Sequence, residues 1–445
     1  MEPSKSGNPQ IIGSATSSRP STFVFKACNC ERAQAMRFHV LGLSPLGVLI
    51  AYHLRASSRS VTLVHKSYRN AWASHNRSRG EISVETGGVV QRCGGFQSEV
   101  LEKGEISGVG IAFNPNLTRD QTPNYVPLAE DIHTCPIESL VVTSKPTHTL
   151  NALSNMLPRL NASSTVVLLQ DGMGIFEELV QKVFRNPETR PNFILASNSN
   201  GAWFKGTLHV VHAALGAIDF GIIPDPRRRD FEASLADESK PKYERQLNLD
   251  DITRPGNPSY NRYRSLRETV AALSSIDALG SKWRPMADVQ IAMRKKLVIS
   301  ALVDPLTALL GCRNGALFRD RGSEGILRNV CKEASEVFRA QLEYETRSYL
   351  NSLAPNTDRN QVPLVRMPPE LEAENLMDEV RRISRRQGNI SSTLTDIKHG
   401  RKTEIQYLNG YLVDLGKKYG VPTPVNATLC DMIHMRSAVP LDQRL

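Results

Sequence analysis

Three polar side chains recur at helical spacing in an apolar segment of the C-terminal third. Lys296, Ser300 and Asp304 are four residues apart, so they share one face of a helix that we expect Pro305 to end. A lysine partly desolvated on such a face has a lowered pKa and can act as a general acid. The spacing alone leaves a solvated helix face as the alternative.

A second polar group follows about a hundred residues later. Asn389 and Ser392 stand where a helix is expected to begin, and Glu404 lies near a further helical run. A serine here can simply cap a helix, and a single glutamate is more often a surface residue than a ligand. Together with Lys296, however, a serine and a glutamate can hold and protonate a small 2-oxo acid.

A glycine-containing turn near residue 42 indicates a nucleotide site. Residues 37–42 predict a buried strand, and the sequence from Gly42 to Gly47 is a G-x-S-x-x-G variant of the dinucleotide fingerprint at the start of a helix. Ser44 occupies the position where the backbone normally approaches the pyrophosphate, and the helix N-terminus would present amide donors. The cofactor-binding candidates of this turn are Gly42, Ser44, Leu46 and Gly47. The alternative is a Rossmann-like domain that has lost its cofactor.

The second strand, expected over 61–64, bears on which cofactor is used. An enzyme that uses NAD places Asp or Glu at the end of this strand, whereas Lys66 follows it here. A cation suits a 2′-phosphate, so we predict NADPH rather than NADH. A plain surface lysine is the alternative reading.

The remaining pattern predicts an α/β domain followed by an all-α domain. Further strands are expected over 140–143, 165–169, 193–196 and 208–211 and a helix over 148–159, which implies a mostly parallel, helix-covered sheet. Residues 67–107 are expected to form a surface insertion, and 225–258 a charged loop. From Ser265 onward the periodicity is helical throughout, over 265–279, 286–310, 322–353, 370–386, 390–418 and 427–437. The predicted domains are a tail or presequence over 1–35, a Rossmann-like dinucleotide-binding domain over 36–224, a linker over 225–262 and an all-helical C-terminal domain over 263–440.

The composition is that of a globular protein with a basic balance. Of 445 residues, 40% are hydrophobic and 22% charged. The formal net charge of +10 would suit anionic partners, but scattered, solvated lysines and arginines are the favoured reading. No apolar stretch is long enough to predict a membrane span. Seven irregularly spaced cysteines favour reduced thiols, an intracellular location, mitochondrial or cytoplasmic, and no metal site. Translation could also start at Met36.

Several motifs together resemble the ketopantoate reductase (2-dehydropantoate 2-reductase) family over about residues 36–437. The most specific are Lys296 with Asp304-Pro305-Leu306-Thr307-Ala308, Asn314-Gly315, Asn389-Ile390-Ser391-Ser392, and Thr403-Glu404-Ile405 with Tyr407 and Asn409-Gly410. Val142-Thr143-Ser144-Lys145 and Leu169-Gln170-Asp171-Gly172-Met173-Gly174 support them.

The resemblance implies NADPH-dependent reduction of 2-dehydropantoate to (R)-pantoate. It assigns Lys296 to protonation of the carbonyl oxygen and Glu404 to orientation of substrate and lysine. It places Asn389 and Ser392 at the substrate. It assigns Lys145 to the cofactor and Lys66 to its 2′-phosphate. A homodimer is possible.

The chain also departs from the family pattern. Ser44 replaces a glycine, Asp171 stands where the family has asparagine beside nicotinamide and substrate, and Ser300 and Asp304 replace two asparagines. Asn200 takes a place often held by histidine. These changes keep open a catalytically degenerate protein that binds RNA or the mitochondrial ribosome, since yeast activators of cytochrome b translation look like degenerate members of this fold.

Overall fold

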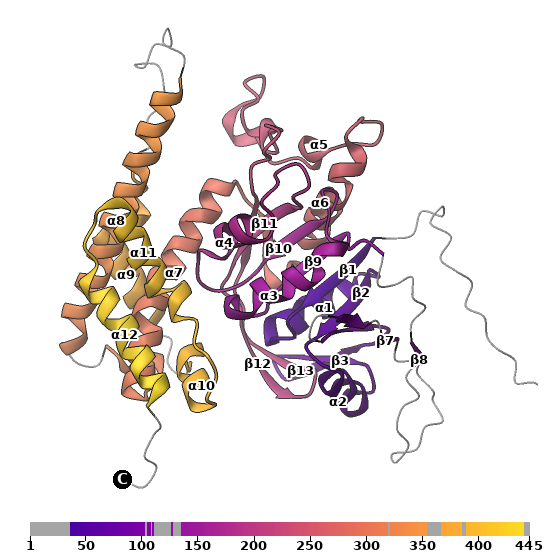
Figure 1. Cartoon of the computed structure of the whole chain (residues 1–445), viewed down its shortest axis with the longest axis horizontal. Coiled ribbons are helices and arrows are strands. Elements are labelled where there is room, and N and C mark those ends of the chain that lie inside the picture. The colour runs from indigo at the N-terminus through magenta and orange to yellow at the C-terminus, as the bar shows by residue number, and fades with distance from the viewer. Residues whose placement is uncertain are drawn as a thin grey trace, which may run out of the picture. The chain divides into compact units, whose positions relative to one another are not determined.

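A nine-stranded sheet organises the first part of the chain in this computed structural model (Figure 1). The structure describes residues 36–102, 105–107, 109–110, 126–127, 135–318, 321–353, 366–384 and 389–439. The predicted tail over 1–35 lies outside them. The strand order is β15-β14-β11-β10-β9-β1-β2-β5-β6. These strands are β1 (Arg37–Leu41), β2 (Ser60–His65), β5 (Gln97–Glu102), β6 (Glu105–Ser107), β9 (Ser139–Val142), β10 (Thr165–Leu168), β11 (Asn192–Asn198), β14 (Ile218–Ile222) and β15 (Ser281–Trp283).

The central strands of this sheet are parallel and buried. β2, β1, β9, β10 and β11 pair in parallel, and every residue of β9 and β10 is buried. Strands buried on both faces are typical of a sheet covered by helices. Helices of this part are α1 (Pro45–Ala56), α2 (Tyr68–Ser78), α3 (Pro146–Met156), α4 (Ile175–Lys182), α5 (Leu249–Ile252) and α6 (Tyr260–Ser274). The predicted fold class is confirmed.

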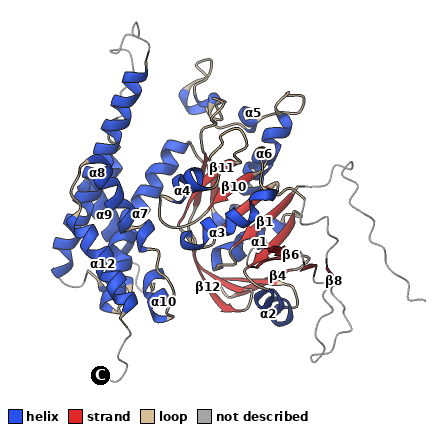
Figure 2. Cartoon of the chain, viewed as in Figure 1, coloured by secondary structure: helices blue, strands red, loops and turns tan. Residues whose placement is uncertain are grey.

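The region expected to be a surface insertion is instead largely regular structure. Residues 67–107 contain α2, two strands of a second sheet and β5, an interior strand of the main sheet. The second sheet runs in the order β12-β13-β3-β4, and a third consists of two strands (Figure 2). The predicted strand at 208–211 belongs to the second sheet. These strands are β3 (Ile82–Thr86), β4 (Val89–Cys93), β12 (Gly201–Gly206), β13 (His209–Ala214), β7 (Val109–Gly110) and β8 (Val126–Pro127).

The expectation of purely helical structure after Ser265 was also wrong at one point. Residues Ser281–Trp283 form β15, which pairs in parallel with β14 at the sheet edge. Helix α6 packs on the same sheet, where the Thr269 hydroxyl donates to that of Ser139 at 2.9 Å. The predicted boundary at 263 falls within α6, and both α6 and β15 attach to the sheet of the first part.

The helical part begins with α7 (Met286–Leu310). The other helices are α8 (Gly322–Ser352), α9 (Ala373–Ser384), α10 (Ser392–Lys398), α11 (Asn409–Tyr419) and α12 (Pro424–Ala438). The helix expected over 390–418 is broken, because a loop and the short 3-10 helix η9 (Ile405–Tyr407) separate α10 from α11. Pro305 does not end α7, which continues for another turn to the left-handed Gly311. Within the described residues, no helix is both long and apolar enough to cross a membrane.

Candidate functional site

The carboxyl ends of four parallel strands meet at one edge of the sheet. Leu41 of β1 pairs with Val142 of β9, which pairs with Leu168 of β10, and β2 ends beside β1. The residues that follow these strands therefore lie together. They include all the predicted cofactor residues, which are Gly42, Ser44, Leu46, Gly47, Lys66, Lys145 and Asp171. Ligands of open α/β sheets bind at this edge, where connections leave the central strand in opposite directions.

The turn after β1 is closed by two glycines. Gly42 has a φ of +94°, and a Cβ there would lie 2.3 Å from the backbone nitrogen of Ser144. A Cβ on Gly47 would lie 2.2 Å from the Gly42 carbonyl oxygen. Ser44 caps α1, since its hydroxyl accepts from the Gly47 amide at 3.1 Å. Leu46 packs half-buried on the core beneath. Both fingerprint glycines thus have the steric role predicted for them.

Basic side chains surround this edge. Lys66 is exposed at the end of β2, and Lys145 precedes α3. Burial and then the charges of Lys66, Lys145 and Lys402 lower the pKa of His148, so the three ammonium groups lie around one imidazole. The site therefore presents a concentration of positive charge suited to an anion.

Lys145 also reaches the helical part. Its ammonium forms an ion pair with the buried carboxylate of Asp396 in α10, whose other oxygen accepts from Arg401 Nε at 3.1 Å. The sequence analysis missed Asp396. Its position four residues after Ser392, on the same helical face, is the signal that could have found it.

Lys296 projects from α7 onto the edge of the sheet. Its ammonium donates to the carboxylate of Asp171, in an ion pair, and to the backbone carbonyl of Asn198 at 2.5 Å. Its side chain is 30% exposed and that of Asp171 51% exposed, so solvent screens this pair. The charges of Lys296 and Asp171 thus neutralise each other.

Asp304 and Ser392 are in direct contact. The Ser392 hydroxyl donates to Asp304 Oδ2 at 3.0 Å, and the Thr393 hydroxyl lies 3.3 Å from the same oxygen. Burial raises the pKa of Asp304 to about 7, against the hydrogen bond from Ser392, and the charge of Asp171 raises it further. Ser391, not Ser392, is the cap of α10.

Glu404 is buried just before η9 and has a strongly altered acidity. Only 7% of the residue is exposed. Burial, followed by the negative charge of Asp171, raises the pKa of Glu404 to about 8, although Lys145 acts in the opposite direction. The charges of Asp171 and Lys145 act on Glu404, and those of Asp171 and Lys296 act on Asp304, so these five groups form one electrostatic cluster.

Main-chain contacts join the loop after β10 to the segment that carries Glu404. The Met173 amide donates to the Tyr407 carbonyl at 2.9 Å. Gly172 has a φ of +84°, and a Cβ there would lie 2.6 Å from that same carbonyl oxygen. The Tyr407 hydroxyl donates to Glu178 Oε2 in α4 at 2.9 Å.

Two predicted substrate residues make no side-chain contact with this cluster. Ser300 is partly buried on α7 without a described hydrogen bond. Asn389 is exposed, and its carbonyl accepts from the Asn314 amide at 3.0 Å. The amide of Asn200 is occupied within the α/β part, where it bonds His212 at 3.0 Å and the Leu279 carbonyl at 3.0 Å.

Several arginines of the described residues form ion pairs. Arg227 forms an ion pair with Glu188, Arg381 with Glu324 and Asp378, and Arg382 with Glu379.

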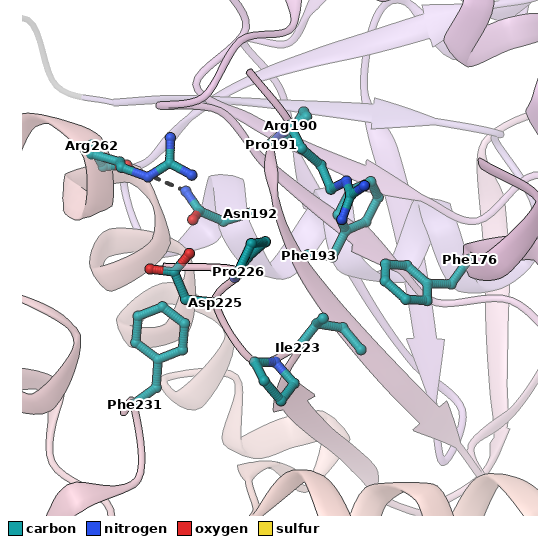
Figure 3. A pocket seen from close by; sticks show the side chains of 11 residues that line it. Phe176, Arg190, Pro191, Asn192, Phe193, Ile223, Asp225, Pro226, Phe231 and Arg262 are labelled. Carbon is teal, nitrogen blue, oxygen red and sulfur yellow. Dashed lines mark hydrogen bonds between the residues drawn. The ribbon is translucent and has the colours of Figure 1, made fainter. Parts of the chain in front are cut away.

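Two hollows lie away from these residues. One, of about 30 Å³, is lined by β11, α6 and the segment after β14, including Asn192, Asp225 and Arg262 (Figure 3). It is large enough for about one or two water molecules. A second, of about 370 Å³, lies between α7 and α8 and is mostly apolar. Neither includes a predicted site residue.

Across the described ranges, no group of three or more His, Cys, Asp or Glu side chains could hold a metal ion.

Comparison with known proteins identifies the family to which this fold belongs. The family model for ketopantoate reductase PanE/ApbA matches residues 38–225, and that for its C-terminal region matches residues 288–437. The chain belongs to the ketopantoate reductase family. It is thus an oxidoreductase built on a dinucleotide-binding fold. Residues 226–287, which include α6 and β15, lie between the two matches of the ketopantoate reductase family.

Individual ketopantoate reductases are distant from this chain. A probable 2-dehydropantoate 2-reductase of Schizosaccharomyces pombe is 26% identical over 299 residues, 66% of this chain and 72% of its own length. The structure of a ketopantoate reductase from Ralstonia eutropha JMP134 matches with a TM-score of 0.57 at 17% identity, covering 91% of this chain and 99% of that one. D-mandelate dehydrogenase with NADH and anilino(oxo)acetate matches with a TM-score of 0.59 at 13% identity and the same coverage.

Proposed function

We propose that this chain catalyses the NADPH-dependent reduction of 2-dehydropantoate to (R)-pantoate, a step toward coenzyme A. One observation carries the proposal. Lys296, from α7, and Glu404, from the segment before η9, belong to one charge cluster around Asp171, at the sheet edge where a dinucleotide binds. A general acid and a buried carboxyl beside a nucleotide site are the groups that carbonyl reduction needs.

The residues of this edge fit a phosphorylated dinucleotide. The two close approaches at Gly42 and Gly47 leave no room for a side chain, which keeps the turn beside β1 tight enough for a pyrophosphate to lie against backbone. Pro45, at the first helical position, has no amide, so the donors left at this end are fewer than in the usual fingerprint. Lys66 and Lys145 supply positive charge nearby. The exposed Lys66 supports NADPH over NADH.

Different side chains of this chain have different roles in the proposed reaction. When bound, NADPH supplies a hydride to the carbonyl carbon of the substrate. The ammonium of Lys296 gives a proton to the carbonyl oxygen, and the Ser392 hydroxyl binds the substrate carboxylate. Glu404 holds the substrate hydroxyl. The exposed amide of Asn389 is available as a further donor at the edge of the site.

The raised pKa values of Asp304 and Glu404 explain how an anionic substrate could enter a site that contains several carboxyl groups. Glu404 is largely protonated at neutral pH because its pKa is about 8, whereas Asp304, with a pKa of about 7, is about half protonated there and largely protonated only at lower pH. Asp171 is neutralised by Lys296. The protonated Asp304 is isosteric with the asparagine it replaces, so it can take over the neutral role of that residue.

Turnover by the purified protein tests the proposal. We expect 2-dehydropantoate to cause oxidation of NADPH, followed by the absorbance of the reduced nicotinamide. We expect Lys296→Ala to reduce kcat by on the order of 10²-fold or more, as loss of a general acid does, with NADPH affinity within a few-fold. Lys295→Ala is the matched control, because the neighbouring lysine pairs with Glu379 at 3.6 Å, outside the cluster. A folded protein that binds NADPH but leaves 2-dehydropantoate unchanged contradicts the proposed substrate.

A further inference from the structure

Helix α7 contains a proline where a backbone donor is needed. Pro305 lies inside the helix and has no amide hydrogen, so it cannot donate to the carbonyl of Ala301 one turn earlier. Ala301 is fully buried. A buried carbonyl without a partner is costly, and such groups are almost always paired. Some other donor must therefore reach this carbonyl for the helix to continue past Pro305.

The donor is a side chain from a distant part of the sequence. Asn409 Nδ2 donates to the Ala301 carbonyl at 2.8 Å, and Asn409 is also fully buried. Asn409 is the first residue of α11, more than a hundred residues away in the chain. Its amide stands in for the backbone N–H that the proline lacks.

Further hydrogen bonds determine the orientation of the Asn409 side-chain amide. Asn409 Nδ2 also donates to Asn426 Oδ1 at 3.0 Å. Asn426 Nδ2 donates to the buried carboxylate of Glu333 at 2.7 Å, so the oxygen of Asn426 must face Asn409. The same carboxylate accepts the amides of Val425 at 2.8 Å and Asn426 at 3.0 Å, at the start of α12. The donating orientation of Asn409 is therefore determined by its partners and does not depend on an arbitrary choice of amide flip.

This bond connects the two segments that carry the proposed chemistry. Ala301 follows Lys296 by little more than one helical turn, and Asn409 begins the helix just after η9 and Glu404. We infer that Asn409 is a positioning residue, whose amide replaces the donor missing at Pro305 and so holds the segment of Glu404 against the helix of Lys296. The inference rests on the proposed function, because it assigns Asn409 to the placement of those two groups.

A double-mutant cycle between Asn409 and Pro305 tests the inference directly. Asn409→Ala leaves the Ala301 carbonyl unpaired, and we expect kcat to fall by about tenfold or more. Pro305→Ala restores a backbone amide that can donate to the same carbonyl. In that background we expect Asn409→Ala to lower kcat by about threefold or less, since the two donors are then redundant. The dissociation constant for NADPH should stay within about twofold in all four proteins, because neither residue lies at the nucleotide edge.

A control variant and a urea-unfolding cycle distinguish a failure of the proposed function from a failure of the positioning role. Asn375→Ala removes an exposed asparagine whose Nδ2 donates to the Pro369 carbonyl at 2.7 Å, and it should change neither kcat nor stability appreciably. Urea unfolding of the same four proteins gives a second cycle that needs no activity. Without turnover in the wild type, the proposed function fails, while the unfolding cycle still decides whether Asn409 and Pro305 are coupled. Equal losses from Asn409→Ala in both backgrounds, in kcat or in the unfolding midpoint, would overturn the positioning role.

Discussion

The ammonium of Lys296, from α7, is bound to the carboxylate of Asp171, from the loop after β10, a position for which the resemblance to the ketopantoate reductases predicts asparagine. The pair is accessible to solvent, so the attraction is of the order of 1 kcal/mol or less rather than the several kcal/mol of a dry site. A substrate must nevertheless compete with Asp171 for the lysine. We therefore expect Asp171 to weaken substrate binding without preventing it.

We predict that Asp171→Asn raises kcat/KM for 2-dehydropantoate by about fivefold, the factor that corresponds to roughly 1 kcal/mol. The variant removes a negative charge beside an anionic substrate and frees the Lys296 ammonium. Steady-state kinetics at neutral pH provide the measurement. Asp219→Asn serves as the control, because Asp219 pairs with Arg284 on the surface at 3.1 Å. A decrease in kcat/KM for Asp171→Asn would mean that the carboxylate itself takes part in the reaction.

Asp304 should limit turnover at alkaline pH. Its pKa is raised to about 7, so above that pH it acquires a charge next to Ser392, the proposed carboxylate-binding residue. We expect Asp304→Asn to match the wild type below pH 7 and to keep more activity above it. Profiles of kcat/KM against pH for the two proteins check this. Superimposable alkaline limbs would show that another group controls the decline.

Glu404 should make the folded protein less stable as pH rises. Its pKa is raised from 4.5 to about 8, so the folded state holds a proton that the unfolded chain has already lost. This contribution is fully present below pH 4.5 and is lost as pH rises to about 8. His53 and His65, whose pKa values are lowered by burial to about 4, act in the opposite direction but only below about pH 6.5.

We therefore expect the urea midpoint of the wild type to fall between about pH 7 and 8, a range above the titration of these histidines. The Glu404→Gln variant should show a flatter dependence, because glutamine resembles the protonated acid and does not titrate. Urea titrations at a series of pH values give the comparison. Parallel curves for the two proteins would place the proton elsewhere.

Lys66 should distinguish the two nicotinamide cofactors. It is exposed at the end of β2, where a 2′-phosphate would lie, and carries no described ion pair. We predict that Lys66→Ala weakens NADPH binding by about tenfold, as loss of one charged hydrogen bond does, and leaves NADH binding almost unchanged. Fluorescence titration with each cofactor measures both constants. Equal weakening of both would mean that Lys66 contacts a part that the two share.

The sequence predicted the edge site well because local rules determine it. The turn from Gly42 to Gly47 follows from a strand, a fingerprint and a helix that are contiguous, and parallel pairing then brings Lys66 and Lys145 to the same edge. The spacing of Lys296 and Asp304 on α7 was equally local. These predictions needed only periodicity and the direction of the strands.

Other features depend on contacts between distant segments and could not be read from periodicity. Pro305 was expected to end its helix, since the rescue of Ala301 by Asn409 is not visible in local sequence. The local sequence over 67–107 predicts a surface insertion, whereas β5 is held inside the main sheet by its pairing with β2. Helical spacing from Ser392 indicates the face on which Asp396 lies, but its ion pair with Lys145, from the other half of the chain, is not visible in local sequence.

The main-chain bond between Met173 and Tyr407, with Gly172 pressed against the same carbonyl, has an evolutionary consequence. The seam that brings the two halves of the site together uses backbone atoms, which a point mutation leaves in place unless it adds bulk at Gly172. Side chains around the site can therefore change, as the departures from the family pattern at positions 44, 171, 300 and 304 suggest, while the backbone that positions them stays in place. Selection could in this way change acidity and substrate preference one residue at a time without first having to rebuild the architecture.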